Sequence, residues 1–186
     1  MKQRAYGFTI VELIIVIVVI AILASISIVT YRGITDRANN TSRIAAGEQW
    51  VRAFQLYQVY NGAMPPSVVA AADNTRFCLG SGFPMGGGGV ARCQNVTGTD
   101  GNSAAESNNA TLMSELQAAT DLPRATPIPT KPGFTGPYLV RGATSIQVTI
   151  GLDGYWAIGT DCGGGFISNW NNNTNTITAC IKTLSL

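Results

Sequence analysis

The chain of 186 residues contains no histidine, and only 12% of its residues are charged. Without histidine, neither a Ser-His-Asp nor a Cys-His catalytic arrangement can form, and the commonest protein ligand for metal ions is missing. We therefore expect a protein that is not an enzyme and that binds no cofactor. The charged fraction is about half that of an average soluble protein, so some of the hydrophobic residues must lie away from water.

Beyond its first residues, the chain also lacks an excess of charge of either sign. The formal net charge is +2, and Lys2 and Arg4 account for it, because the chain after residue 7 has ten basic and ten acidic side chains. A neutral surface does not attract polyanions. We therefore do not expect the bulk of the surface to bind nucleic acid.

The sequence has four cysteines but no C-x-x-C pair, the spacing that is typical of structural zinc sites. The cysteines are Cys78, Cys93, Cys162 and Cys180. An even number, all far from the hydrophobic N-terminal segment, is typical of two disulfides formed in an oxidising compartment. Three pairings are possible. Sequence proximity favours Cys78–Cys93 and Cys162–Cys180, with a zinc site as the alternative.

One long hydrophobic run, Phe8 to Val29, holds much of the apolar excess, and Glu12 is its only charged residue. The run contains no proline or glycine, and as an α-helix it would extend over about 33 Å, enough to cross a bilayer. A secretory signal peptide has a shorter apolar region that ends in a small-residue cleavage site. An ordinary single-pass anchor or an uncleaved signal sequence is the simplest interpretation. Because Lys2 and Arg4 precede the run, we expect a cytoplasmic N-terminus.

A helical pattern continues beyond this run, with one apolar face. The residues expected on the apolar face are Ile34, Ala38, Ala45, Trp50, Val51, Phe54 and Tyr57, and those expected on the solvent-facing surface are Arg37, Arg43, Glu48 and Arg52. Asn61-Gly62 is typical of a helix C-cap, and Pro65-Pro66 prevents continuation. The sequence predicts one helix from about Phe8 to about Tyr60, on the order of 80 Å long. Its second half should pack on a globular head.

Glu12 is unusual because a carboxylate on a membrane helix costs about 2.5–3.5 kcal/mol at mid-membrane and less near an end. No basic residue follows it within one helical turn. Two interpretations are open. Glu12 is either a tolerated charge near the membrane interface, or it pairs with a positive group on another molecule.

The segment Gly7-Phe8-Thr9-Ile10-Val11-Glu12-Leu13, after a short basic leader and before an unbroken apolar run, resembles the type IV prepilin signature. The resemblance covers Lys2 to about Tyr31 closely. It implies that prepilin peptidase cuts between Gly7 and Phe8 on the cytoplasmic side and methylates the new amine of Phe8. It also implies that Glu12 neutralises the Phe8 amine of an adjacent subunit during assembly. Many family members carry a proline where this chain has Val29, which leaves the assembly geometry open.

The rest of the chain predicts a small α+β head. Glycine-rich and polar stretches read as loops, and a short helix is expected from about Asn109 to Ala119, followed by a proline-rich connection. Period-two alternation predicts strands at Ser145–Ile150 and Ile177–Leu184, and a turn at Asp153-Gly154 predicts a returning strand over Tyr155–Gly159. Three antiparallel strands on the amphipathic half of the helix give the α+β architecture that the resemblance also implies. In that architecture Cys162 and Cys180 close an exposed C-terminal loop.

Two aspartates are the only candidates for a metal site in this head. Asp153 and Asp161 flank the expected second strand, beside glycines. Aspartates in this context are usually turn formers, and no D-x-D-x-D spacing supports a calcium site. We therefore expect no metal, with Asp153 and Asp161 as a weak alternative.

Together these observations predict four parts: a prepilin leader peptide at 1–7, a membrane-spanning and polymerising helix at 8–30, its amphipathic half at 31–62, and a globular pilin head at 63–186. The resemblance implies a structural subunit of a type IV pilus-like filament, which is anchored in the cell membrane as a precursor and extracellular once assembled. Its partners would be copies of itself and other pilins, prepilin peptidase and an inner-membrane assembly platform.

Two alternatives to the pilus subunit stay open. The first is a pseudopilin or minor pilin of a type II secretion or DNA-uptake system, which shares the signature. The second is a monomeric, membrane-tethered binding domain, which would not be cut at Gly7.

Overall fold

A computed structural model describes residues 9–83, 85, 89, 91–94, 104–105, 109–123, 136–171 and 177–186. The predicted cleavage position between Gly7 and Phe8, the side chain of Val29 and most of the proline-rich connection lie outside the described residues. The chain divides into two compact units, with the boundary between Ala38 and Asn39.

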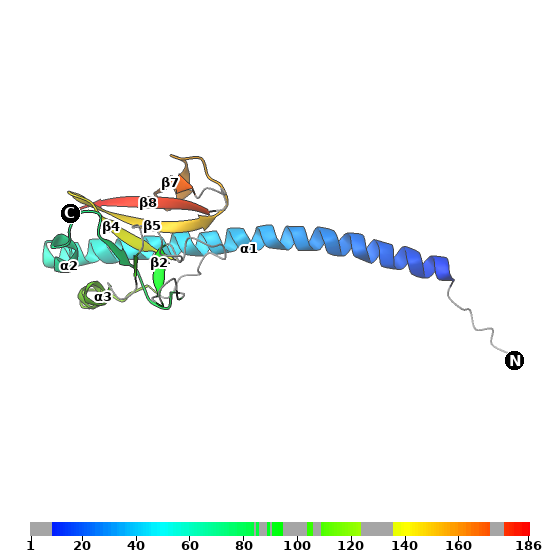
Figure 1. Ribbon diagram of the computed structural model, residues 1–186, viewed down its shortest axis with the longest axis horizontal. Coiled ribbons are helices and arrows are strands. Elements are labelled where there is room, and N and C mark those ends of the chain that lie inside the picture. The colour runs from blue at the N-terminus through cyan, green and yellow to red at the C-terminus, as the bar shows by residue number, and fades with distance from the viewer. Residues whose placement is uncertain are drawn as a thin grey trace. The chain divides into compact units, whose positions relative to one another are not determined.

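Helix α1 (Ile10–Asn61) passes through both units, and it confirms the long helix expected from the sequence (Figure 1). It runs without interruption because its sequence contains no proline, and its two glycines are separated by more than three turns. It ends where Gly62 adopts a left-handed backbone conformation (φ 73°) and donates its N–H to the carbonyl of Gln58 at 2.8 Å. This is the usual way in which a glycine ends a helix.

An antiparallel sheet of six strands accompanies this helix, which confirms the pilin-like α+β class. The strands, in sheet order, are β1 (Arg76–Cys78), β4 (Tyr138–Arg141), β5 (Ser145–Asp153), β8 (Ile177–Ser185), β7 (Phe166–Asn171) and β6 (Asp161–Gly163). Figure 1 shows β4, β5 and β8 lying side by side. The smaller elements are helices α2 (Pro66–Val69) and α3 (Ala110–Gln117) and a two-stranded sheet of β2 (Arg92–Gln94) and β3 (Ala104–Ala105).

The predicted hairpin at Asp153-Gly154 is wrong. β5 continues through Asp153 and pairs with β8 along its whole length, whereas Tyr155–Gly159 forms no strand. Side chains instead fix this segment: Thr178 accepts the backbone N–H of Trp156 and donates its hydroxyl to the carbonyl of Gly154. The sheet also has six strands rather than three. β1, β4 and β6 have three or four residues, too few to show an alternating pattern, and β7 does not alternate in the expected sense because it buries Ser168 and exposes Ile167.

Two hydrophobic clusters lie on opposite faces of the sheet, because neighbouring residues of a strand point to opposite faces. In β1, Phe77 belongs to the cluster that includes residues of α1, whereas Cys78 belongs to the second cluster. In β8, Cys180 and Ala179 divide in the same way. Helix α1 therefore packs on one face, and the chain around Phe83 covers part of the other.

The face of α1 that packs on the sheet is partly different from the predicted one. Trp50, Phe54 and Tyr57 are buried as expected, but Ala45 is exposed. Arg43, expected at the surface, is almost completely buried. Its burial is possible because the sheet supplies a carboxylate partner that lies far away in the sequence.

At Gly47 the backbone of α1 lies close to the sheet. A Cβ atom at this position would lie 2.8 Å from both Cγ2 of Ile150 and Cζ of Phe166. Both of these side chains are buried, so neither can move aside freely. Glycine at this helix position thus allows the helix backbone to contact the sheet directly.

Two disulfides cross-link strands of the head, one on each face of the six-stranded sheet. Cys78–Cys93 joins β1 to β2, and Cys162–Cys180 joins β6 to β8. These are the pairs that sequence proximity favours. All four cysteines are in disulfides, which leaves no thiolate for a zinc site.

Candidate functional site

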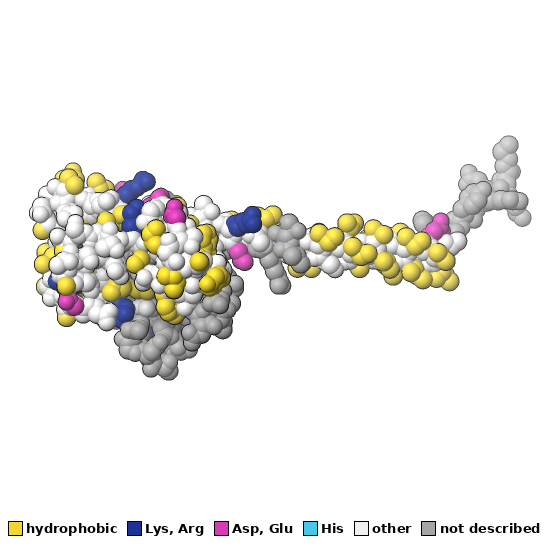
Figure 2. Space-filling model, turned by 90° about the horizontal axis from the view of Figure 1, so that it is seen from above, with side chains coloured by type: hydrophobic (Ala, Val, Ile, Leu, Met, Phe, Trp, Pro, Cys, Tyr) yellow, Lys and Arg dark blue, Asp and Glu magenta, His cyan; other side chains and the backbone are white. Residues whose placement is uncertain are grey.

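The N-terminal part of α1 exposes hydrophobic side chains around its whole circumference. From Ile10 to Ile28 the large aliphatic side chains have exposed fractions of 49–78%. Figure 2 shows these hydrophobic side chains along the helix. In the described part of the chain, α1 is the one helix long and apolar enough to cross a membrane, and none of its most apolar 18-residue window is buried. Such a surface is stable only in lipid or against other apolar surfaces.

Glu12 is held in a reciprocal capping arrangement at the start of this helix. The backbone N–H and the hydroxyl of Thr9 both donate to Oε2 of Glu12, at 2.9 and 2.7 Å. The backbone N–H of Glu12 donates in return to Oγ1 of Thr9 at 3.2 Å. Thr9 is therefore the N-cap residue and Glu12 the third helical residue, which is the geometry of a capping box.

The capping box uses only one oxygen of the Glu12 carboxylate. Both bonds from Thr9 reach Oε2, and neither uses Oε1. Among the residues that the structure describes, no lysine or arginine forms an ion pair with Glu12. The carboxylate is thus partly satisfied within its own helix and can accept one more cationic donor.

Sequence reasoning had missed this role of Thr9. The pattern Thr9-x-x-Glu12 at the beginning of an apolar run is a recognised signal for a capping box.

Other polar side chains of the apolar segment are satisfied inside the helix. Ser25 donates its hydroxyl to the carbonyl of Ala21, and Ser27 donates to that of Leu23, both at 2.8 Å. A hydroxyl bonded to its own helix can lie in lipid at little cost, because no donor is left without an acceptor. Within the described window, Glu12 is therefore the one group that calls for a partner of opposite charge.

The described residues of the head form no comparable chemical site. Asp153 is not a turn former: its Oδ2 accepts a hydrogen bond from Arg43 at 2.8 Å, and both side chains are buried. Asp161 accepts the backbone N–H of Gly163 at 2.8 Å. The described residues contain no group of three or more potential metal ligands, and the two aspartates do not form one.

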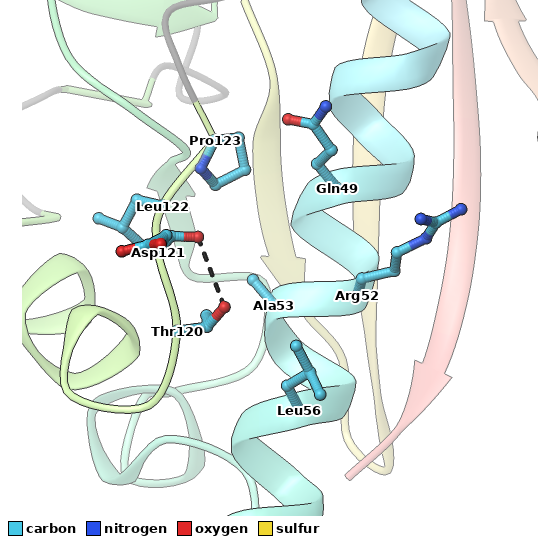
Figure 3. Close-up of a pocket in the computed structure, with 8 residues that line it drawn as sticks. All are labelled: Gln49, Arg52, Ala53, Leu56, Thr120, Asp121, Leu122 and Pro123. Atoms are coloured by element: carbon cyan, nitrogen blue, oxygen red, sulfur yellow. Dashed lines mark hydrogen bonds between the residues drawn. The ribbon is translucent and has the colours of Figure 1, made fainter.

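One groove on the head encloses about 440 Å³ between α1 and the chain that follows α3. Its lining residues are Gln49, Arg52, Ala53, Leu56, Thr120, Asp121, Leu122 and Pro123. Figure 3 shows the side chain of Arg52 extending away from Asp121, so the two charged groups do not converge. The two charged side chains of the groove therefore form no ion pair with each other.

Comparisons with known proteins bear on the N-terminal segment alone. No curated protein and no solved structure matches the chain. Residues 2–28, however, match the family described as the prokaryotic N-terminal methylation motif. This chain therefore carries the type IV prepilin signature on a pilin-like α+β fold.

Proposed function

We propose that this chain is the structural subunit of a type IV pilus-like filament. The observation that carries the proposal is the exposed apolar surface of α1 from Ile10 to Ile28, directly after the sequence at which prepilins are processed. Before assembly, lipid covers this surface. In the filament, the same helix of neighbouring copies covers it.

Processing would create a cationic partner for the Glu12 carboxylate. Prepilin peptidase would cut after Gly7 and methylate the amine of Phe8, which lies one residue before the capping box. The leader residues Lys2 and Arg4 keep this end of the precursor in the cytoplasm. The head would then lie across the membrane, where the two disulfides can form.

Glu12 would supply the register of assembly. Association of apolar helices inside a bilayer gains no hydrophobic free energy, because lipid is as apolar as the helices themselves. A buried ion pair between Glu12 and the Phe8 amine of an adjacent copy forms only at one relative position, so it selects one register. Thr9 satisfies Oε2 of Glu12 within the subunit, and Oε1 would accept the amine.

Two variants separate the charge of Glu12 from its capping role. Glu12→Gln keeps the capping box, since glutamine also serves at this position, but removes the charge. Thr9→Val removes the cap hydroxyl and keeps the charge. We expect the Glu12→Gln subunit to be cut normally but to yield at least about tenfold fewer filaments. Thr9→Val should be affected less. Normal filament yield from Glu12→Gln would contradict the pairing.

Mass spectrometry of filaments sheared from the native cells tests the function itself. The proposal predicts that this chain dominates the filaments, begins at methylated Phe8 and has four hydrogens fewer than the reduced chain. Absence from filaments, with a cut chain retained in the membrane, would favour a pseudopilin or minor pilin. An intact Met1 terminus would instead indicate a membrane-tethered domain.

A further inference from the structure

Asn40, Arg43 and Asp153 form a buried polar network between α1 and the end of β5. Arg43 donates to Oδ2 of Asp153 at 2.8 Å and to Oδ1 of Asn40 at 3.1 Å. The side-chain exposures of Arg43 and Asp153 are 2% and 1%. The network lies in the first turn of α1 within the second compact unit, which begins at Asn39.

Asn40 binds the backbone of β5 at Asp153, beyond the point where β4 pairs with β5. β4 pairs with β5 only as far as Thr149, which lies opposite the first residue of β4. Beyond this point the backbone of β5 needs other partners on that side. The side-chain amide of Asn40 donates to the carbonyl of Asp153 at 2.8 Å, and its Oδ1 accepts the N–H of Asp153 at 2.9 Å. Two backbone groups of the sheet are thus bound by one residue of the helix.

The polar network restricts the position of α1 on the sheet more sharply than apolar contacts do, because hydrogen bonds form only over a narrow range of distances. The contact surface of the helix consists of apolar side chains such as Trp50, Val51 and Phe54. A shift of one helical turn moves every side chain by about 5.4 Å and would also bring a Cβ atom to the place that Gly47 leaves open beside Ile150 and Phe166. The polar network does not tolerate this shift, because all three of its bonds between helix and sheet have hydrogen-bonding distances that such a displacement breaks.

Stability is a weak explanation for such a network. Replacing a buried ion pair by apolar side chains of similar volume is often neutral or stabilising. In addition, Oδ1 of Asp153 is buried and has no hydrogen-bond partner in the described part of the chain. In some proteins, buried polar groups of this kind select one arrangement of the packed elements.

We propose that Asn40, Arg43 and Asp153 are a register pin, which selects one position of α1 on the sheet and so gives every copy of the head the same orientation on its helix. The pin acts within the second unit of a single chain. It is therefore independent of whether the chain forms filaments, although uniform heads are what a regular filament requires.

The test replaces the pin by apolar side chains and counts the conformations of the helix. The variant is Asn40→Leu with Arg43→Met and Asp153→Leu, in the full chain in detergent micelles. The reporter is the indole N–H signal of Trp50, one of three tryptophans in the chain, in a nitrogen–proton NMR spectrum. Trp50 is 1% exposed and lies on α1 in the core, so a changed register changes its surroundings.

We expect one Trp50 signal from the unaltered chain and at least two from the triple variant, with the weaker at about one tenth of the stronger or more. The matched control removes a second ion pair, that of Asp73 with Arg141, by Asp73→Asn. This pair is partly exposed and links two segments outside α1, so one signal should remain.

A second variant covers the case in which the triple variant does not fold. Asn40→Ala keeps the ion pair and removes the two bonds to the backbone of Asp153, and it should also give a second Trp50 signal. A single signal in every variant that folds would overturn the proposal. Failure of both variants to fold would overturn it as well, because the network would then hold the fold itself rather than its register.

Discussion

Substitution of Gly47 sets two opposing effects against each other. In a helix interior, alanine is more favourable than glycine by about 1 kcal/mol. The added Cβ would, however, lie 2.8 Å from Ile150 and from Phe166 on the facing sheet. Overpacking of a filled core costs about 1–3 kcal/mol. The contact should therefore outweigh the gain in helix propensity.

The cost of the added Cβ at Gly47 is expected to be near the middle of that range, about 2 kcal/mol. Ile150 and Phe166 are 2% and 0% exposed, so they can move only by displacing other core side chains. Gly47→Ala should lower the free energy of unfolding by about 1 kcal/mol. Gly47→Val adds two methyl groups and gains less helix propensity, so it should lower it by about 2 kcal/mol or more.

Thermal unfolding of the full chain in micelles, followed by circular dichroism, measures this series. With a shift of about 2–4 °C per kcal/mol, Gly47→Val should melt about 4–8 °C below the unaltered chain, and Gly47→Ala between the two. Gly33→Ala is the matched control on the same helix, because no atom lies within 4 Å of its added Cβ. A melting temperature of Gly47→Val at or above that of the unaltered chain would refute the close contact of helix and sheet.

Three further perturbations test the head. Burial raises the pKa of Tyr138 to about 12. The stability that the neutral phenol contributes is therefore complete below about pH 10, the pKa of an unfolded tyrosine, and is lost between about pH 10 and 12. In denaturant titrations, Tyr138→Phe should reduce this alkaline loss of stability by at most about 2–3 kcal/mol. Replacing Cys78 and Cys93 by alanine removes a cross-link of sequence separation 15 and should lower the free energy of unfolding by about 3 kcal/mol, and an unchanged urea midpoint would contradict this. Asn109→Ala leaves the carbonyls of Cys78 and Gly80 without the amide that now donates to both, so the urea midpoint should fall by the equivalent of about 1–3 kcal/mol.

The long helix was predictable because its signals are local. Periodicity, the absence of proline before Pro65 and the glycine at Gly62 all lie within or beside the element they define. The disulfide pairs could be favoured for the same reason, since each joins cysteines that are close in sequence. The capping box of Thr9 and Glu12 was also predictable from the sequence, because it is a local pattern.

The features that could not be predicted depend on distant partners. Arg43 looks like a surface residue until Asp153, separated from it by 110 positions, is placed beside it. The turn at Asp153-Gly154 looked like a hairpin because nothing local shows that β5 instead pairs with β8. Short edge strands such as β1 take their structure from the strand beside them, and three residues carry too little pattern of their own.

The place of β8 in the sheet has a consequence for the order in which the head is built. β8 is the last strand in the chain, yet it lies between β5 and β7 and carries Cys180. Until Ile177–Ser185 has left the ribosome, the β6–β7 hairpin has no strand that links it to the rest of the sheet. A chain made from its N-terminus would thus have its apolar helix inserted in the membrane well before its head could close. The membrane anchor would hold the incompletely folded head at the membrane, and the Cys162–Cys180 disulfide would form only after β8 has been made.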